Sequence, residues 1–228
     1  MTVSSSQITI FGGRFGCGKT EIALNYALEQ AKKGNAPFLI DLDIVTPYFR
    51  TRDRAKQMAE QGVEIVSPFE VGQYIHIPAI DPRILGAIEQ AERPVILDVG
   101  GDEQGARALS QYADTIKQKG YEMHFVVNPY RPFMDSATGV REAVREIETS
   151  SRLRASTLVS NPNLMSETSP ELFNKGHKQV LQAADALGLQ VSMAVMSKSL
   201  LKKMVQPSLN VPILVIHRFF LMFDVEEQ

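Results

Sequence analysis

Residues 13–20 have the residue types and the spacing that bind a triphosphate. Gly13, Gly18, Lys19 and Thr20 occupy every fixed position of the pattern G-x-x-x-x-G-K-[ST]. Glycines let the backbone fold around the phosphates, so that main-chain N–H groups point inward. The Lys19 ammonium places a cation between the β- and γ-phosphates, and the Thr20 hydroxyl can ligate Mg²⁺. The pattern therefore predicts a site for a nucleoside triphosphate and Mg²⁺.

The segments on either side of this loop fit that prediction. A short apolar run at residues 8–11 precedes it, and residues 21–33 carry apolar side chains at helical spacing. We therefore expect a buried strand, the loop and then a helix whose positive N-terminal end faces the anion. The residues expected to contact the nucleotide here are Gly13, Gly16, Cys17, Gly18, Lys19, Thr20 and Glu21.

The composition bounds the class of protein. A chain of 228 residues suits one large α/β domain, so we expect residues 1–228 to form a single nucleotide-binding domain. The net charge of -2 provides no strong basic field for nucleic acid or an anionic membrane. The single cysteine excludes an intramolecular disulfide and a cysteine-based zinc site. Without a signal-peptide core or a membrane-length apolar run, the expected compartment is the cytoplasm.

Expected strands and helices alternate along the whole chain. Most strands are continuous apolar runs, which favours an α/β P-loop NTPase with a mostly parallel seven- or eight-stranded sheet and helices on both faces. Ligands then bind at the carboxyl ends of the strands. The expected strands are residues 8–11, 37–43, 63–66, 94–99, 122–127, 155–160, 190–195 and 212–216. The expected helices are residues 21–33, 48–61, 82–92, 103–120, 134–150 and 170–187.

An acidic residue follows the apolar part of the fourth expected strand. Val95-Ile96-Leu97-Asp98 has the form of a Walker B element, so Asp98 is expected to hold the Mg²⁺ shell through water. Asp98-Val99-Gly100-Gly101 also fits D-x-x-G, in which the Gly101 amide bonds the γ-phosphate and releases it after hydrolysis. The alternative for Asp98 is a helix cap or a turn residue.

These motifs resemble those of the MinD/ParA branch of P-loop NTPases, the SIMIBI-class group with a deviant Walker A motif. The loop of that family reads roughly G-K-G-G-x-G-K-[ST]. Here Arg14 stands where the family has an additional lysine, and Phe15 replaces a small residue. The resemblance implies a nucleotide-dependent homodimer in which Arg14 reaches the phosphates bound by the partner. An arginine keeps the charge and adds a bidentate fork.

The same resemblance assigns roles at two other strand ends. The family's second strand typically ends in D-x-D, and the second aspartate faces the attacking water and the metal. The resemblance implies that role for Asp43 and a structural role for Asp41. An asparagine at the end of the sixth strand often reads the adenine edge, which implies that role for Asn161. Asn128 ends the fifth strand in a similar way and is the alternative. Because the guanine-reading N-K-x-D motif is absent, ATP is favoured over GTP.

The first functional hypothesis is a MinD/ParA-like ATPase that acts as a nucleotide switch controlling an unknown protein partner or cargo. Lys19, Asp43 and Arg14 are its expected catalytic residues, and turnover is expected to be slow and partner-dependent. The expected Mg²⁺ ligands are Thr20, Asp43 and Asp98.

The second hypothesis is a small-molecule kinase or an ATP-dependent ligase of the dethiobiotin synthetase or cobyrinate amidase type. Its substrate would be held by Arg50, Arg52 and the irregular residues 67–78. A third hypothesis is a nucleotide-binding module without turnover. The apolar residues 213–223 near the end of the chain are expected to form the last strand and a segment that covers the core. The alternative for residues 219–223 is an exposed protein interface.

Overall fold

The strands form one parallel sheet with β1 near its centre. A computed structural model of the chain describes residues 7–43, 54–67, 81–90, 92–204 and 209–220. Within it, eight strands pair in the order β3-β2-β4-β1-β5-β6-β7-β8, and each adjacent pair is parallel. The strands are β1 (Ile8–Gly12), β2 (Phe38–Leu42), β3 (Glu64–Val66), β4 (Val95–Val99), β5 (Tyr121–Val127), β6 (Thr157–Ser160), β7 (Gln190–Ser197) and β8 (Ile213–Ile216).

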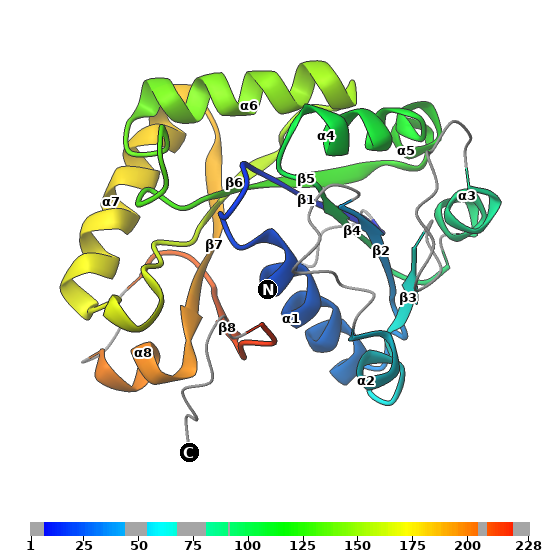
Figure 1. Cartoon of the computed structure of the whole chain (residues 1–228), viewed down its shortest axis with the longest axis horizontal. Coiled ribbons are helices and arrows are strands. Elements are labelled where there is room, and N and C mark those ends of the chain that lie inside the picture. The colour runs from blue at the N-terminus through cyan, green and yellow to red at the C-terminus, as the bar shows by residue number, and fades with distance from the viewer. Residues whose placement is uncertain (1–6, 44–53, 68–80, 91, 205–208, 221–228) are drawn as a thin grey trace.

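Helices cover both faces of this sheet. In Figure 1, α4, α5 and α6 lie over one face, whereas α1 and α2 lie on the other. The helices are α1 (Lys19–Lys32), α2 (Ala55–Ala59), α3 (Pro82–Glu89), α4 (Glu103–Ser110), α5 (Ala113–Lys119), α6 (Ala137–Ser151), α7 (Pro170–Leu187) and α8 (Lys198–Lys203). Within the described part of the chain, none of the helices has both the length and the apolar character needed to span a bilayer.

The strand order creates a switch point beside β1. From β1 the chain first builds the β4, β2 and β3 side of the sheet and then returns to add β5 to β8 on the other side. Every residue of β1, β2 and β4 is buried, as expected for mostly apolar strands that are covered on both faces. Ligands bind at the carboxyl ends of the strands next to such a switch point. The loop that follows β1 lies at this position.

The predicted fold class is confirmed, and the differences are local. The helix expected over 103–120 is wrong as a single element, because it divides into α4 and α5 at Gln111 and Tyr112. Tyr112 is buried there, and its hydroxyl accepts a hydrogen bond from the Asp81 N–H. The short helix α8 was not expected. Of the helix expected over 48–61, residues 48–53 lie outside the described residues.

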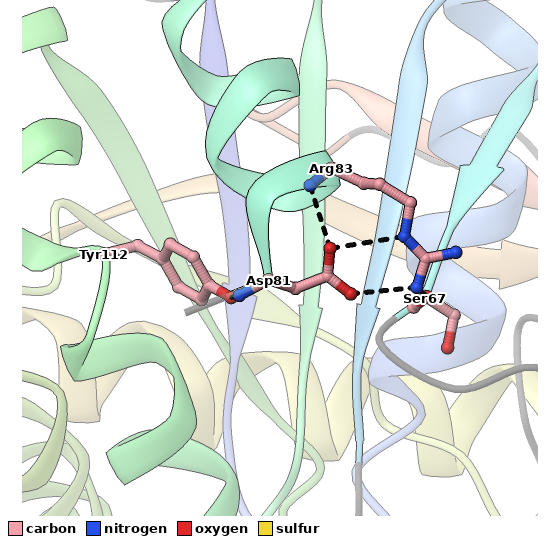
Figure 2. Close-up of polar contacts among 4 residues, drawn as sticks. All are labelled: Ser67, Asp81, Arg83 and Tyr112. Carbon is pink, nitrogen blue, oxygen red and sulfur yellow. Dashed lines mark hydrogen bonds and ion pairs between the residues drawn. The ribbon is translucent and has the colours of Figure 1, made fainter. Parts of the chain in front are cut away.

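The start of α3 connects three parts of the fold. Asp81 is the N-cap, and its carboxylate accepts a hydrogen bond from the Arg83 main-chain N–H at 2.8 Å. Figure 2 shows the Arg83 guanidinium beside the same carboxylate, with an Nη2–Oδ2 distance of 2.9 Å. The side-chain hydrogen bond from Arg83, followed by the main-chain one, lowers the pKa of the Asp81 carboxyl. Arg83 also donates to the Ser67 carbonyl directly after β3. Arg83 and Tyr112 therefore fix α3 against both β3 and the α4–α5 junction.

Two buried histidines, one on a strand and one on a helix, lie within hydrogen-bond distance of hydroxyl groups on the strands. Nδ1 of His124 on β5 lies 2.7 Å from the Thr157 hydroxyl on β6 and 3.1 Å from the Ser192 hydroxyl on β7. Nδ1 of His177 on α7 lies 2.8 Å from the Ser160 hydroxyl. Burial lowers the pKa of both imidazoles, although Glu122 partly opposes the shift at His124.

These buried imidazoles predict an acid-sensitive fold. Since the folded pKa lies below the unfolded value of about 6.5, the stabilisation is complete above pH 6.5 and is lost as the pH falls through the folded pKa. Each unit of lowering corresponds to roughly 1.4 kcal/mol. Urea unfolding between pH 7.5 and pH 5 should show a falling free energy of unfolding. The double variant His124→Gln, His177→Gln should flatten that slope; an unchanged slope would contradict the assignment.

Candidate nucleotide-binding site

Residues 13–20 form a tight loop that only glycine permits at three positions. Gly13, Gly16 and Gly18 have φ values of 144°, 75° and 92°, in the region that L side chains rarely adopt. A Cβ on Gly13 would also lie 2.6 Å from the Val126 carbonyl oxygen on β5. Gly18 is the N-cap of α1, so the helix starts directly from the loop with Lys19. The backbone conformation of the loop therefore explains why the motif requires glycine at positions 13 and 18.

Segments that follow three other strands brace this loop from outside. After β6, the Asn161 amide donates to the Cys17 carbonyl at 2.7 Å. After β5, Arg131 Nε donates to the Gly16 carbonyl at 2.9 Å. After β4, Gly101 lies so close that a Cβ there would be 2.4 Å from the Phe15 nitrogen. The loop is thus held by the carboxyl ends of the strands on both sides of β1.

Lys19 and Thr20 lie where the loop becomes α1. The Lys19 side chain is buried, and its Nζ donates to the Arg14 carbonyl at 3.1 Å across the loop. The positive N-terminal end of α1 faces the same space as this ammonium. Two sources of positive potential therefore meet at the loop.

A cavity of about 420 Å³ opens over the loop and is large enough for a small-molecule ligand. It brings together seven residues predicted for the site: Gly16, Gly18, Lys19, Thr20, Glu21, Asp43 and Asn161. The remaining lining residues are Phe15, Arg131, Pro132, Asn163, Met165, Ile216, Arg218 and Phe220. Of the other predicted residues, Gly13 and Cys17 belong to the loop, and Gly101 packs against it.

The two predicted aspartates come from adjacent strands. Asp43 directly follows β2 and is buried at the cavity, and its main-chain N–H donates to the Asp41 carboxylate at 3.1 Å. Asp98 on β4 is buried in register with Phe11 of β1 and Asp41 of β2. No group of three His, Cys, Asp or Glu residues is arranged to hold a metal within the described ranges. A Mg²⁺ ion here would need phosphate oxygens beside the Thr20 hydroxyl.

Arg14 points away from the cavity toward α6 of its own chain. Its Nη2 lies 2.9 Å from Oε2 of Glu146, and both side chains remain partly exposed. Its guanidinium carbon also lies 6.0 Å from the centre of the Phe133 ring. In this structure the arginine expected to reach a partner therefore forms an ion pair within the chain.

Glu21 does not present a free carboxylate to the cavity. Its oxygens accept hydrogen bonds from the main-chain N–H groups of Phe219 and Phe220, beyond β8. Burial raises the pKa of this carboxyl, while the two N–H groups and the nearby Arg218 and Arg54 act in the opposite direction. Glu21 therefore ties the first turn of α1 to a segment that lies about 200 residues away in the sequence.

Large apolar side chains are exposed near the cavity mouth. Phe15 of the loop and Phe133 after β5 are 69% and 72% exposed, and Met165 after β6 is 37% exposed. Phe15 and Met165 line the cavity, and Phe133 lies beside Arg14. Apolar groups gathered at a polar site are typical of a surface that contacts a ligand or another protein.

Sequence comparison and structure comparison give different results. No protein-family model matches this sequence, and no curated protein matches it. Solved structures do match. FtsY from Mycoplasma mycoides has a TM-score of 0.55 at 16% identity, over 82% of this chain and 59% of that chain. The signal recognition particle receptor FtsY from Elizabethkingia anophelis, solved with GDP, has a TM-score of 0.56 at 16% identity, over 85% and 58%.

A third similar structure, also solved with GDP, is the signal recognition particle 54 kDa protein from Aeropyrum pernix. Its TM-score is 0.53 at 18% identity, over 81% of this chain and 40% of that one. This chain has the fold of a P-loop NTPase. The three structures belong to the SIMIBI class of P-loop NTPases. They do not confirm the resemblance of this chain to the MinD/ParA branch. This chain spans less than two thirds of the length of each.

The site also contains residues that the sequence motifs did not indicate. Arg131 lies in a segment that the sequence pattern indicates only as the break after the fifth strand. A cation at this place, after a strand that lies next to β1, could have indicated an anion-binding site. Glu146 is one of several charged residues on α6, and no sequence pattern around it indicated the ion pair with Arg14. Arg218 and Phe220 line the cavity, although their segment was expected to cover the core or to form a protein interface. Of residues 48–54, only Arg54 lies within the described residues.

Gly18 allows a direct test of the loop geometry. Gly18→Ala combines a positive φ with a Cβ only 2.5 Å from the Asn161 amide nitrogen, so it should destabilise the fold and displace the Asn161–Cys17 contact. Gly188→Ala is the matched control, since it has a positive φ but no atom within 4 Å, and it should cost only about 1–2 kcal/mol of strain. Urea unfolding should show the larger loss for Gly18→Ala; equal losses would contradict the predicted clash.

Proposed function

We propose that the chain binds ATP with Mg²⁺, hydrolyses it slowly and acts as a MinD/ParA-like nucleotide switch for a protein partner. The observation that carries this proposal is the cavity in which Lys19, Thr20 and Asp43 meet over the glycine loop. The proposal includes one nucleotide-binding domain over residues 1–228 and a cytoplasmic location. The P-loop NTPase fold supports a nucleotide-binding function in general.

The residues of the chain divide the chemistry among them. The loop amides and the Lys19 ammonium hold the phosphates, and their charge stabilises the charge that develops during transfer. Thr20, and Asp98 through water, would hold Mg²⁺, which would neutralise phosphate oxygens. The Asp43 carboxylate orients a water for in-line attack on the γ-phosphate. The Gly101 N–H senses that phosphate by donating a hydrogen bond to it. Because Gly101 packs on Phe15, its movement would be transmitted to the loop.

Among the described residues, the side chains directly after β6 support adenine over guanine, because they include no carboxylate. A site that reads guanine needs an acceptor for the ring N1–H and for the exocyclic amino group, which N-K-x-D proteins supply with an aspartate. The four residues that follow β6 here are Asn161-Pro162-Asn163-Leu164, without a carboxylate. Of the lining residues that the structure describes, the acidic ones are Glu21, which already accepts two main-chain N–H groups, and Asp43, beside the phosphate loop. The structures solved with GDP make GTP the competitor to be tested.

The dimer part of the proposal involves Arg14 and the exposed rim. To reach a partner's phosphates, the Arg14 guanidinium must leave Glu146. A partly exposed ion pair is worth about 0–1 kcal/mol, so a triphosphate can displace it. The exposed Phe15 and Phe133 lie beside Arg14 and would be covered by a second copy.

Lys19→Ala tests the binding site. Loss of a charge-assisted contact of roughly 1.5–3 kcal/mol should weaken Mg·ATP binding about 10- to 100-fold and abolish turnover. Lys32→Ala, at the other end of α1, is the matched control and should keep the wild-type affinity. Calorimetric titration with Mg·ATP and Mg·GTP measures both the affinity and the choice of base. Equal affinity of Lys19→Ala and wild type would contradict the assignment, and tighter GTP binding would contradict the choice of ATP.

Arg14 and Glu146 test the dimer. With Mg·ATP the wild type should elute as a dimer in size-exclusion chromatography with light scattering, and Arg14→Ala should not. Glu146→Gln frees the guanidinium and should tighten the dimer up to about fivefold, given the modest strength of the ion pair. Glu142→Gln on the same helix is the control. A monomer in every nucleotide state would contradict this part of the proposal.

The kinase or ligase alternative keeps the same triphosphate site. Its candidate substrate residues Arg50 and Arg52, and all but Ser67 of residues 67–78, lie outside the described residues, so no structural observation favours it. Phosphate release from ATP that needs no acceptor molecule would speak against it.

A further inference from the structure

The main-chain segment after β8 is fastened to α1 by an asparagine. The Asn25 amide nitrogen donates to the His217 carbonyl at 2.9 Å, and its amide oxygen accepts from the His217 N–H at 2.8 Å. Asn25 is buried, and it forms this two-way pair much as a neighbouring strand would. The segment therefore leaves the sheet and runs along the first turns of α1.

Glu21, one turn before Asn25, holds the next part of the segment. Its Oε1 accepts from the Phe219 N–H at 3.0 Å and from the Phe220 N–H at 2.8 Å. On the other side, Arg54 donates to the Phe219 carbonyl, and its guanidinium carbon lies 5.3 Å from the centre of the Phe220 ring. Most of these contacts are made to main-chain atoms, so they fix where the segment's side chains project.

The segment supplies part of the cavity wall. The loop and the start of α1 form the phosphate end of the cavity, so a nucleoside must occupy the remainder. There, Arg218 and Phe220 line the cavity together with Pro132, Met165 and Ile216. Apolar side chains with a guanidinium suit a flat heteroaromatic base, which can stack on an aromatic ring or an arginine.

We propose that Glu21 and Asn25 are positioning residues that hold Arg218 and Phe220 as the wall for the nucleoside part of the bound nucleotide. This inference rests on the proposed nucleotide-binding function, and it assigns different residues to the phosphates and to the nucleoside. Lys19 and the loop act on the phosphates, whereas Glu21 acts on the nucleoside end through the main chain of residues 217–220. The expected nucleotide contact of Glu21 is thereby replaced by an indirect one.

Separate probes for the two ends of the cavity test this role. Inorganic tripolyphosphate has the phosphates without the nucleoside, so its affinity should not depend on Arg218 and Phe220. With Mg²⁺ present, Glu21→Ala should weaken ATP binding about tenfold, the scale of one lost base stack, and change tripolyphosphate binding less than about twofold. Glu21→Gln should retain ATP affinity, because its amide oxygen can still accept both N–H groups. Lys19→Ala should weaken both ligands.

Two further variants keep the test decisive. Phe220→Ala leaves Glu21 and α1 intact and should show the same selective loss of ATP if Glu21→Ala folds poorly. Glu29→Ala, two turns further along α1, is the control and should bind both ligands as the wild type does. The inference is overturned if Glu21→Ala and Phe220→Ala leave ATP affinity unchanged, or weaken tripolyphosphate equally. A wild type that binds neither ATP nor GTP would overturn the proposed function itself, and this inference with it.

Discussion

A loop that binds an anion through its amide N–H groups has to be held in place by other atoms. The outside hydrogen bonds to residues 13–20 meet this constraint. Asn161 and Arg131 donate to the carbonyl oxygens of Cys17 and Gly16, and neither bond competes with a phosphate for an N–H donor. Lys19 bonds the Arg14 carbonyl in the same way from within. The Cys17 N–H also donates to the Arg14 carbonyl, at 3.2 Å. The loop is therefore held in shape largely through its carbonyl oxygens, and the braces from outside use none of its N–H donors.

The sheet order supplies these braces. Because β1 lies between β4 and β5, with β6 one strand further, the segments that follow all three strands end beside the loop. Gly101 approaches from the β4 side, while Arg131 and Asn161 approach from the other. Asn161, which the family resemblance linked to adenine, has its amide on the Cys17 carbonyl in this structure. Asn161 therefore lines the cavity and braces the loop at the same time.

The loop and the sheet follow from local patterns, whereas the contacts that complete the site do not. Glycine spacing and the alternation of strands and helices are visible in short windows, which is why the loop and the parallel strands were predictable. The strand order, and with it the switch point beside β1, is known only from the structure. The Glu146–Arg14 pair and the Asn25–His217 bonds join residues 132 and 192 positions apart, and no local signal marks them. The division of the 103–120 helix is similar, since it accompanies burial of Tyr112 against Asp81, a tertiary contact.

The central claim is that the amides of residues 13–20 bind the phosphates directly. Hydrogen–deuterium exchange of the full chain, with and without saturating Mg·ATP, tests it most directly. Peptides that cover this loop and the first turn of α1 should exchange more slowly with Mg·ATP and return to the free rate when the nucleotide is removed. Unchanged exchange in these peptides, at nucleotide concentrations that protect another part of the chain or none, would contradict the account.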